Sequence, residues 1–154
     1  MKNRTLVEQI SERELVLTRT FDAPAHLVFE AWTKQELFVR WWLPQAFREA
    51  LVSCDLDVRV GGSYRLVFRH GDGELAFHGR YIEVVPASRL VWTNEESEAG
   101  TQITTVTFAE QDGKTVVVVH ELYPSKEAFD TSRGAEDGMV EGFDQLDVLL
   151  AGAA

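Results

Sequence analysis

The segment GMVEGFDQLDVLLA, residues 138–151, carries the pattern that decides the fold. Its large apolar side chains recur at spacings of four, three and four residues: Met139, Phe143, Leu146 and Leu150. Because an α-helix completes one turn about every 3.6 residues, this spacing predicts a helix with one apolar stripe along its length. Such a stripe must be buried, so the rest of the chain has to supply a surface for it.

The stretch before this helix, from Arg48 to Tyr123, alternates apolar and polar residues with a period of two. This period is typical of β-strands, whose successive side chains point to opposite faces. Turn residues separate the strands, with Gly61-Gly62, His70-Gly-Asp-Gly73 and Gln111-Asp-Gly113 as the clearest cases. The predicted strands cover residues 51–58, 64–69, 77–85, 89–93, 102–110 and 114–122. Consecutive strands joined in this way predict an antiparallel meander.

One further strand and two short helices precede the meander. Residues Glu14 to Phe21 alternate in the same way and are rich in β-forming residues. Pro24 then suits the first turn of a helix, where its missing N–H costs nothing, and Pro44 ends a second helix. Residues 1–12 are expected to form a flexible N-terminal segment. With 154 residues, the chain is expected to form a single domain that spans residues 1–154.

Together these elements predict an α+β fold of the helix-grip type. It consists of a curved antiparallel sheet of about seven strands, two short helices after the first strand and a long C-terminal helix. A curved sheet needs its concave face covered, and the last helix is the only predicted element long enough to cover it. Gly134, Gly138 and Gly142 recur every four residues. Three explanations stay open: the glycines leave room for a cavity beneath the helix, they let the helix pack closer to the sheet, or the helix is broken near residue 134.

The charge of the chain excludes several classes of partner. There are 15 Lys and Arg residues against 25 Asp and Glu residues, which gives a formal net charge of −10. Nucleic-acid binding depends on clustered cations, and the sequence has no basic cluster. No stretch approaches the roughly 20 apolar residues of a membrane span, and no signal peptide is evident. These features predict a cytoplasmic protein that binds no nucleic acid.

Four segments of the sequence resemble one known family. They are FDAPAHLVFEAWTKQELFVRWWLP (residues 21–44), DVRVGGSYR (57–65), FHGRYIEVVPASRLVWT (77–93) and the ending quoted above. In this order they resemble the SRPBCC (START-like) superfamily, in particular the bacterial group similar to the C-terminal domain of the activator of the Hsp90 ATPase. The resemblance implies the START-like/Bet v 1-like helix-grip fold and a deep apolar cavity between the sheet and the C-terminal helix. It does not imply one activity, because the fold hosts carriers, cyclases and resistance proteins.

Large aromatic residues are the candidates for lining such a cavity. The chain has four Trp, nine Phe and three Tyr residues, and each can bury roughly 150–250 Å². Strand alternation and the apolar helix stripe place a subset of them, with one methionine, on inward faces. The predicted ligand-binding residues are Trp32, Trp41, Phe68, Phe77, Tyr81, Trp92, Phe108, Met139 and Phe143. Core packing is the alternative role for each of them.

Polar groups suited to catalysis are scarce. The sequence has no serine-nucleophile motif, phosphate-binding loop or dinucleotide fingerprint. Glu121 and Tyr81 are weak catalytic candidates on faces expected to point inward, and a hydrogen-bonded structural role is the alternative. His70, His78 and Asp72 share one hairpin but are typical solvated residues, so no metal site is predicted. No cofactor is implied.

Three functions remain open on these grounds. The first is the binding of a small hydrophobic molecule, lipid-like or polyketide-like, in the cavity. The second is an enzyme of the cyclase, aromatase or hydrolase type that uses the same cavity, although the lack of motifs favours a protein that is not an enzyme. The third is a protein-interaction module related to the Hsp90 ATPase activators. A homodimer stays open as well, because Val116 and Val118 are expected to face outward from the sheet.

Overall fold

Eight antiparallel strands form one curved sheet in the part of the chain that the computed structural model describes, residues 4–132 and 134–153. The strands are β1 (Leu6–Ser11), β2 (Glu14–Phe21), β3 (Leu51–Leu56), β4 (Ser63–His70), β5 (Gly73–Val85), β6 (Arg89–Asn94), β7 (Gln102–Gln111) and β8 (Lys114–Leu122). Their order across the sheet is β1-β2-β8-β7-β6-β5-β4-β3. The meander from β3 to β8 is therefore continuous, and β2 joins it by pairing with β8.

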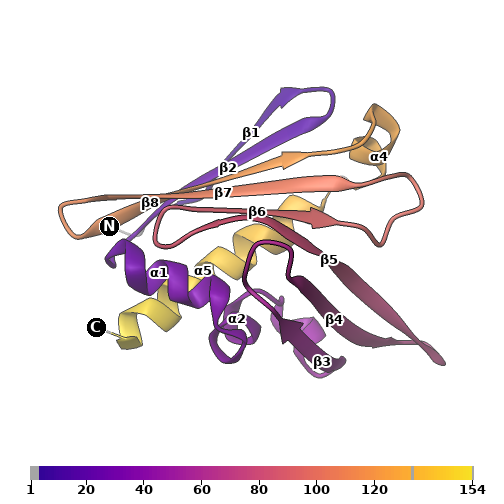
Figure 1. Cartoon of the computed structure of the whole chain (residues 1–154), viewed down its shortest axis with the longest axis horizontal. Coiled ribbons are helices and arrows are strands. Elements are labelled where there is room, and N and C mark those ends of the chain that lie inside the picture. Colours follow the sequence, from indigo (N-terminus) through magenta and orange to yellow (C-terminus); the bar gives the residue numbers. More distant parts are fainter. Residues whose placement is uncertain (1–3, 133, 154) are drawn as a thin grey trace.

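Helices cover the concave face of this sheet. The described residues form α1 (Ala25–Thr33), α2 (Gln35–Trp41), α3 (Gln45–Arg48), α4 (Lys126–Thr131) and α5 (Ala135–Ala153). The first three connect β2 to β3, and α4 leads from β8 into α5. In Figure 1, α5 runs beneath the sheet, with α1 and α2 beside it on the same face. This arrangement confirms the predicted α+β helix-grip fold, with the single turn α3 added between the predicted helices and the meander.

Strand β1 is the one strand that the sequence analysis did not predict. It raises the number of strands from about seven to eight and lies within the segment expected to be flexible. It forms a hairpin with β2 in which Ser11 pairs with Glu14. The first five of its six residues are exposed, so neither face carries the apolar alternation of a half-buried strand. An edge strand without a buried face leaves no periodic signal in the sequence.

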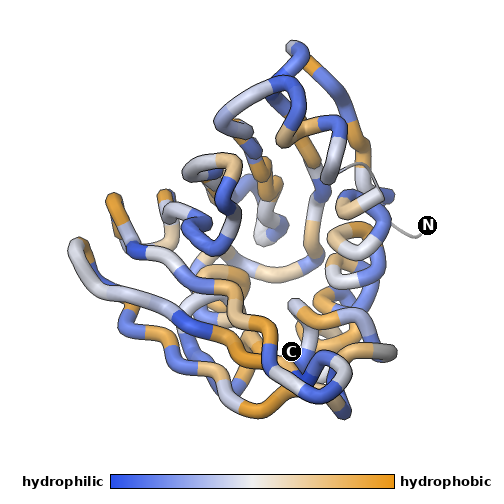
Figure 2. The backbone as a smooth tube through the Cα atoms, turned by 90° about the vertical axis from the view of Figure 1, so that its right-hand side faces the viewer, coloured by the Kyte–Doolittle hydropathy of each residue, from blue (hydrophilic) through white to orange (hydrophobic). Residues whose placement is uncertain are grey.

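The alternation of β8 shows which face of the sheet is the interior. The odd-numbered residues from Thr115 to Glu121 are buried, and the even-numbered residues between them are only half-buried. Along many strands the backbone alternates between hydrophobic and hydrophilic residues in the same way (Figure 2). Val116 and Val118 lie on the outer face, as expected. A homodimer formed through that face stays a prediction.

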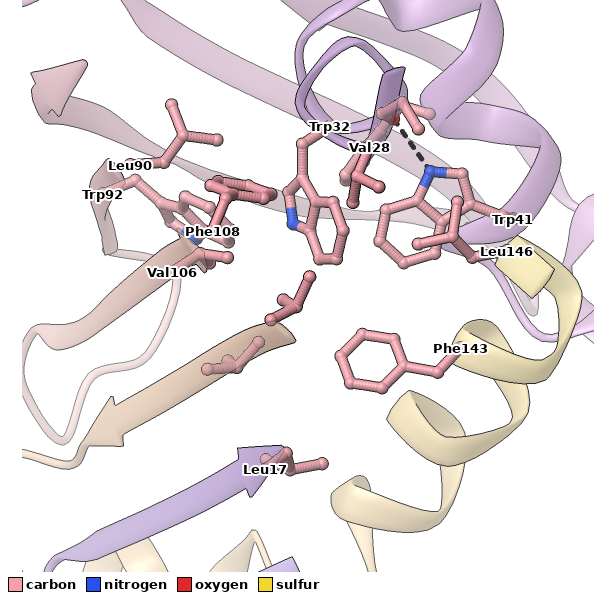
Figure 3. Close-up of a cluster of buried hydrophobic side chains, with 14 of the residues drawn as sticks. Leu17, Val28, Trp32, Trp41, Leu90, Trp92, Val106, Phe108, Phe143 and Leu146 are labelled. Atoms are coloured by element: carbon pink, nitrogen blue, oxygen red, sulfur yellow. Dashed lines mark hydrogen bonds between the residues drawn. The ribbon is translucent and has the colours of Figure 1, made fainter. Parts of the chain in front are cut away.

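Aromatic rings from α1, α2 and α5 meet at the centre of the core. Trp32 of α1 and Trp41 of α2 have ring centroids 4.4 Å apart. The ring of Phe143 on α5 lies 6.0 Å from Trp32 and 5.7 Å from Phe21 of β2. Figure 3 shows Phe143 pointing from α5 toward both tryptophans, and a 2.8 Å hydrogen bond from Trp41 Nε1 to the carbonyl oxygen of Ala31. These contacts hold the three helices together and onto the sheet.

The recurring glycines near the C-terminus have separate roles. Gly134 has a φ of +98°, which favours glycine, and the helix begins only after it. Gly142 lies close to α2, since a Cβ atom there would be 3.2 Å from the carbonyl oxygen of Trp41. A Cβ atom on Gly138 would meet a carbon atom of Pro44 at an ordinary 3.7 Å. The pattern therefore combines a helix boundary at Gly134, a close helix contact at Gly142 and an ordinary contact distance at Gly138.

Candidate functional site

A cavity of about 710 Å³ lies between the helices and the inner face of the sheet. Side chains from α1, α2, α3 and α5 and from strands β3 to β8 line it. The wall is mainly apolar and includes all four tryptophans of the chain: Trp32, Trp41, Trp42 and Trp92. Small-molecule sites in proteins typically measure roughly 300–1,000 Å³ and are lined by such side chains. The cavity therefore has the size and character of a site for a small hydrophobic molecule.

Eight of the nine predicted ligand-binding residues line this cavity: Trp32, Trp41, Phe68, Phe77, Tyr81, Trp92, Met139 and Phe143. Phe108 is not part of the lining. Its ring packs under α1, with centroids 5.5 Å from Phe29 and 5.3 Å from Trp32. Strand alternation placed Phe108 on the correct inner face, but the helix crosses β7 there and fills the space. That the other eight bind a ligand stays a prediction.

Several lining residues were not among the predicted set. Tyr64 and Leu66 of β4 alternate with Phe68 on the inner face, so the rule that identified Phe68 could also have identified them. Trp42 is the C-terminal cap of α2, keeps helical backbone angles and stacks on Phe38, four residues earlier, at 5.0 Å. Helical spacing could therefore have placed Trp42 beside Phe38 on the wall.

Exposed apolar side chains mark one side of the cavity as its mouth. Phe47 of α3 is 56% exposed, and Leu75 and Phe77 of β5 are 44% and 42% exposed. All three line the cavity, together with the exposed residues Arg69 and His70 at the end of β4. A hydrophobic molecule that approaches from this side meets apolar surface before it enters.

Polar side chains of the cavity gather around Glu121 of β8. Glu121 is buried, and its Oε2 atom accepts hydrogen bonds from Gln102 Nε2 and from Thr104 Oγ1, the latter at 3.0 Å. Thr104 is also the register partner of Glu121 across β7 and β8, so the sheet fixes the position of the carboxyl group. Tyr81, the other weak catalytic candidate, lines the cavity as well. A catalytic role for either residue stays a prediction.

Burial shifts the ionisation of this carboxyl group. It raises the pKa of Glu121 to about 7, although the hydrogen bonds from Thr104 and Gln102 favour the charged form. Burial likewise raises the pKa of Tyr64 and of Tyr81, so both phenols are uncharged at neutral pH. Glu121 can therefore change its charge near neutral pH inside the cavity.

This shift should make the stability of the protein depend on pH. The unfolded chain loses the Glu121 proton near pH 4.5 and the folded chain near pH 7, so the free energy of unfolding falls as the pH rises through this window. The loss attributable to Glu121 should be about 3 kcal/mol. In urea unfolding, the stability of Glu121→Gln relative to wild type should therefore increase by about that amount as the pH rises from about 4 to about 8. A difference that stays constant with pH would contradict this prediction.

Neither a metal-binding cluster nor a membrane-spanning helix is found among the described residues. Among residues 4–132 and 134–153, no group of three or more His, Cys, Asp or Glu side chains is placed to hold a metal ion. In the same part of the chain, no helix has the length and apolar character needed to cross a membrane.

Known proteins share this architecture. The family model described as Activator of Hsp90 ATPase homolog 1-like protein matches residues 22–151. A Rhodobacter sphaeroides protein of known crystal structure is 23% identical, with a TM-score of 0.87 over 98% of this chain and 100% of that one. A Staphylococcus epidermidis protein solved in solution is 27% identical, with a TM-score of 0.78 over 96% and 94% of the two chains. CalU16 from Micromonospora echinospora is 18% identical, with a TM-score of 0.63 over 96% and 83%. No curated protein matches the chain.

These similarities confirm the resemblance found in the sequence. The family model covers most of the chain, and the similar structures extend over nearly all of it. The chain therefore belongs to the Activator of Hsp90 ATPase homolog 1-like family, whose SRPBCC-like fold generally binds hydrophobic ligands.

Proposed function

We propose that this protein binds a small hydrophobic molecule, lipid-like or polyketide-like, in the cavity between the sheet and α5. The observation that carries the proposal is the cavity itself, with about 710 Å³ of space and four tryptophans in its wall. Burial of apolar surface contributes roughly 25 cal/mol per Å², from which the costs of association and ordering are subtracted. Polar groups around Glu121 orient the ligand at one end.

Narrowing the cavity should weaken binding. Gly138 lines the cavity and has room for a side chain, so Gly138→Leu should occupy ligand space without a backbone clash. The probe is N-phenyl-1-naphthylamine, an uncharged fluorescent molecule. All four tryptophans line the cavity, so bound probe should quench the tryptophan emission of the protein. We expect Gly138→Leu to raise the Kd of the probe by at least about tenfold.

A matched control lies on the same helix. Gly152 is exposed, and a Cβ atom there would meet no atom within 4 Å. Gly152→Leu should therefore leave the Kd within about twofold of wild type, and thermal unfolding of both variants is the check that they fold. Equal affinities for Gly138→Leu and wild type would contradict the proposed location, and a wild-type protein that binds no probe would contradict the proposed function.

An enzyme of the cyclase, aromatase or hydrolase type is a second candidate function, and Glu121 is the observation that favours it. A carboxyl group with a pKa of about 7 at the wall of a cavity suits general acid or base catalysis near neutral pH. For the hydrolase case, p-nitrophenyl butyrate is a suitable test substrate. Catalysis predicts ester cleavage above background that is lost in Glu121→Gln while N-phenyl-1-naphthylamine still binds. Equal rates of p-nitrophenyl butyrate cleavage by wild type and Glu121→Gln would exclude a catalytic role of Glu121 on this ester.

A further inference from the structure

The carboxyl group of Glu121 has one oxygen atom that receives no hydrogen bond from the described residues. Gln102 and Thr104 both donate to Oε2, and no group donates to Oε1. The side chain is only 5% exposed and lines the cavity, yet Oε1 is not among the fully enclosed atoms that lack a partner. Oε1 is therefore the oxygen atom that a molecule in the cavity can reach.

A chain of hydrogen bonds holds the carboxyl group in this orientation. The single proton of the Tyr64 hydroxyl group is shared between the carbonyl oxygen of Thr93 at 2.7 Å and Asn94 Oδ1 at 3.0 Å. Asn94 Nδ2 donates to Thr104 Oγ1 at 2.9 Å. Thr104 accepts that bond and donates its own proton to Glu121 Oε2. Since the Thr104 hydroxyl has one proton, the chain has a single direction and ends on Oε2. Side chains of β4, β6 and β7 thereby present Oε1 of Glu121 to the cavity.

Aromatic rings border the same end of the cavity. The ring centroids of Tyr64 and Tyr81 are 5.9 Å apart, and those of Tyr81 and Trp92 are 6.4 Å apart. Trp92 is the register partner of Thr104, the residue that donates to Glu121. The rings and the carboxyl group therefore sit on adjoining strands of one sheet. The faces of aromatic rings attract cations, so this end combines two features that recognise an ammonium group.

No basic side chain of the described residues neutralises Glu121. The basic residues that line the cavity are Arg69 and His70, both exposed at the mouth, and neither bonds to Glu121. Glu96 adds a second carboxyl group to the lining. A buried carboxylate without a cationic partner is costly, so a ligand that supplies a positive charge here gains the most.

We infer that the ligand of this cavity is a hydrophobic amine. Its ammonium group donates to Glu121 Oε1 and lies beside the aromatic rings just described, and its apolar body extends toward the mouth. This inference rests on the proposed function and adds the class of ligand: an amine binds in preference to the alcohol or the carboxylic acid with the same hydrocarbon chain.

Binding of an amine should depend on pH through Glu121. Burial raises the pKa of Tyr64 and of Tyr123, so these neighbours add no charge near neutral pH. An ammonium group pairs with the ionised form of Glu121, and the affinity should fall about tenfold from pH 8 to pH 6 as the carboxyl group takes up a proton. Tyr64 of β4 and Tyr123 after β8 are the titratable groups that interact with Glu121 itself. Tyr81 of β5 and Glu96 of the β6–β7 connection line the same cavity. Glu95 acts on Tyr64, and Glu136 of α5 acts on Tyr123.

Displacement of bound N-phenyl-1-naphthylamine by three compounds with the same chain tests the inference. Decylamine, decanol and decanoate are compared on the wild-type protein at pH 8, below their micelle-forming concentrations. Decylamine should displace the probe at a concentration at least about tenfold lower than decanol, and decanoate should be the weakest. At pH 6 the affinity for decylamine should fall about tenfold while that for decanol is unchanged.

Two variants test whether the preference for decylamine depends on the charge of Glu121. Glu121→Gln removes the charge and keeps an oxygen atom that can accept from Gln102 and Thr104, so decylamine and decanol should bind it with similar affinity. Glu8→Gln removes the same charge from the exposed strand β1 and should keep the preference for the amine.

The outcomes separate this inference from the proposed function. Equal displacement by decylamine and decanol overturns the inference while probe binding, and with it the proposed function, stands. A preference for decylamine that survives in Glu121→Gln overturns it as well. A wild-type protein that does not bind the probe overturns both. The comparison on wild-type protein requires no variant to fold.

Discussion

Replacing Arg19 with alanine should lower the free energy of unfolding by about 3 kcal/mol, because Arg19 is a buried cation that joins the sheet to α5. It lies on the inner face of β2 and is 2% exposed. Its Nη1 atom donates to Asp144 Oδ1 at 2.6 Å, and its Nη2 atom pairs with Asp147. The expected loss is at the lower end for buried ion pairs, since both carboxylates can still reach water. Urea unfolding measures it.

Two further variants define what the Arg19 result means. The Asp144 side chain is 53% exposed, so Asp144→Asn should cost less than about 1 kcal/mol. Arg40 is exposed on α2, and Arg40→Ala should change the stability by no more than about 0.5 kcal/mol. If Arg19→Ala lost as little as these controls, the ion pairs would not be what fastens α5 to the sheet.

Replacing Trp41 with alanine should have the larger effect, a loss of about 4–5 kcal/mol. Trp41 is 1% exposed, and its ring contacts Trp32 and Phe143, with centroids 4.4 Å and 6.2 Å away. Alanine removes these contacts and enlarges the cavity that Trp41 already borders. It also leaves the Ala31 carbonyl oxygen without the indole N–H. The same urea experiment measures the loss.

The matched variant is Trp41→Phe. Phenylalanine keeps an aromatic ring in the cluster but cannot donate to Ala31, so the expected loss is about 1–2 kcal/mol. Phe47→Ala serves as a second control, because Phe47 is an aromatic lining residue that is 56% exposed, and its loss should stay below about 1 kcal/mol. Similar losses for Trp41→Ala and Trp41→Phe would show that ring packing contributes little at this position.

Most of the fold could be predicted because its elements each bury one face. The stripe from Met139 to Leu150 indicated α5, and the period-two stretches indicated the strands from β2 to β8. Strand β1 lacked such a signal because nearly all of its residues are exposed. Its position is set by hydrogen bonding to β2, and the residues of β1 alone do not reveal this pairing.

The candidate site was harder to predict than the fold. Alternation assigns a residue to a face, and on that basis Phe77 and Tyr81 were placed correctly in the cavity wall. It does not say where along a strand a helix lies, and Phe108, which alternation also assigns to the inner face, packs under α1 and does not line the cavity. The hydrogen bonds from Gln102 and Thr104 to Glu121 depend on the register of β7 against β8, which no local pattern in the sequence reports.

The two halves of the C-terminal helix α5 make different contacts. Its first half, from Ala135 to Phe143, forms part of the cavity wall, whereas Asp144 and Asp147 in its second half hold Arg19. The residues that line the cavity and the residues that anchor the helix thus lie on different turns of α5. Substitutions at Gly138 or Met139 can consequently change the shape of the cavity while Asp144 and Asp147 continue to hold the helix to β2.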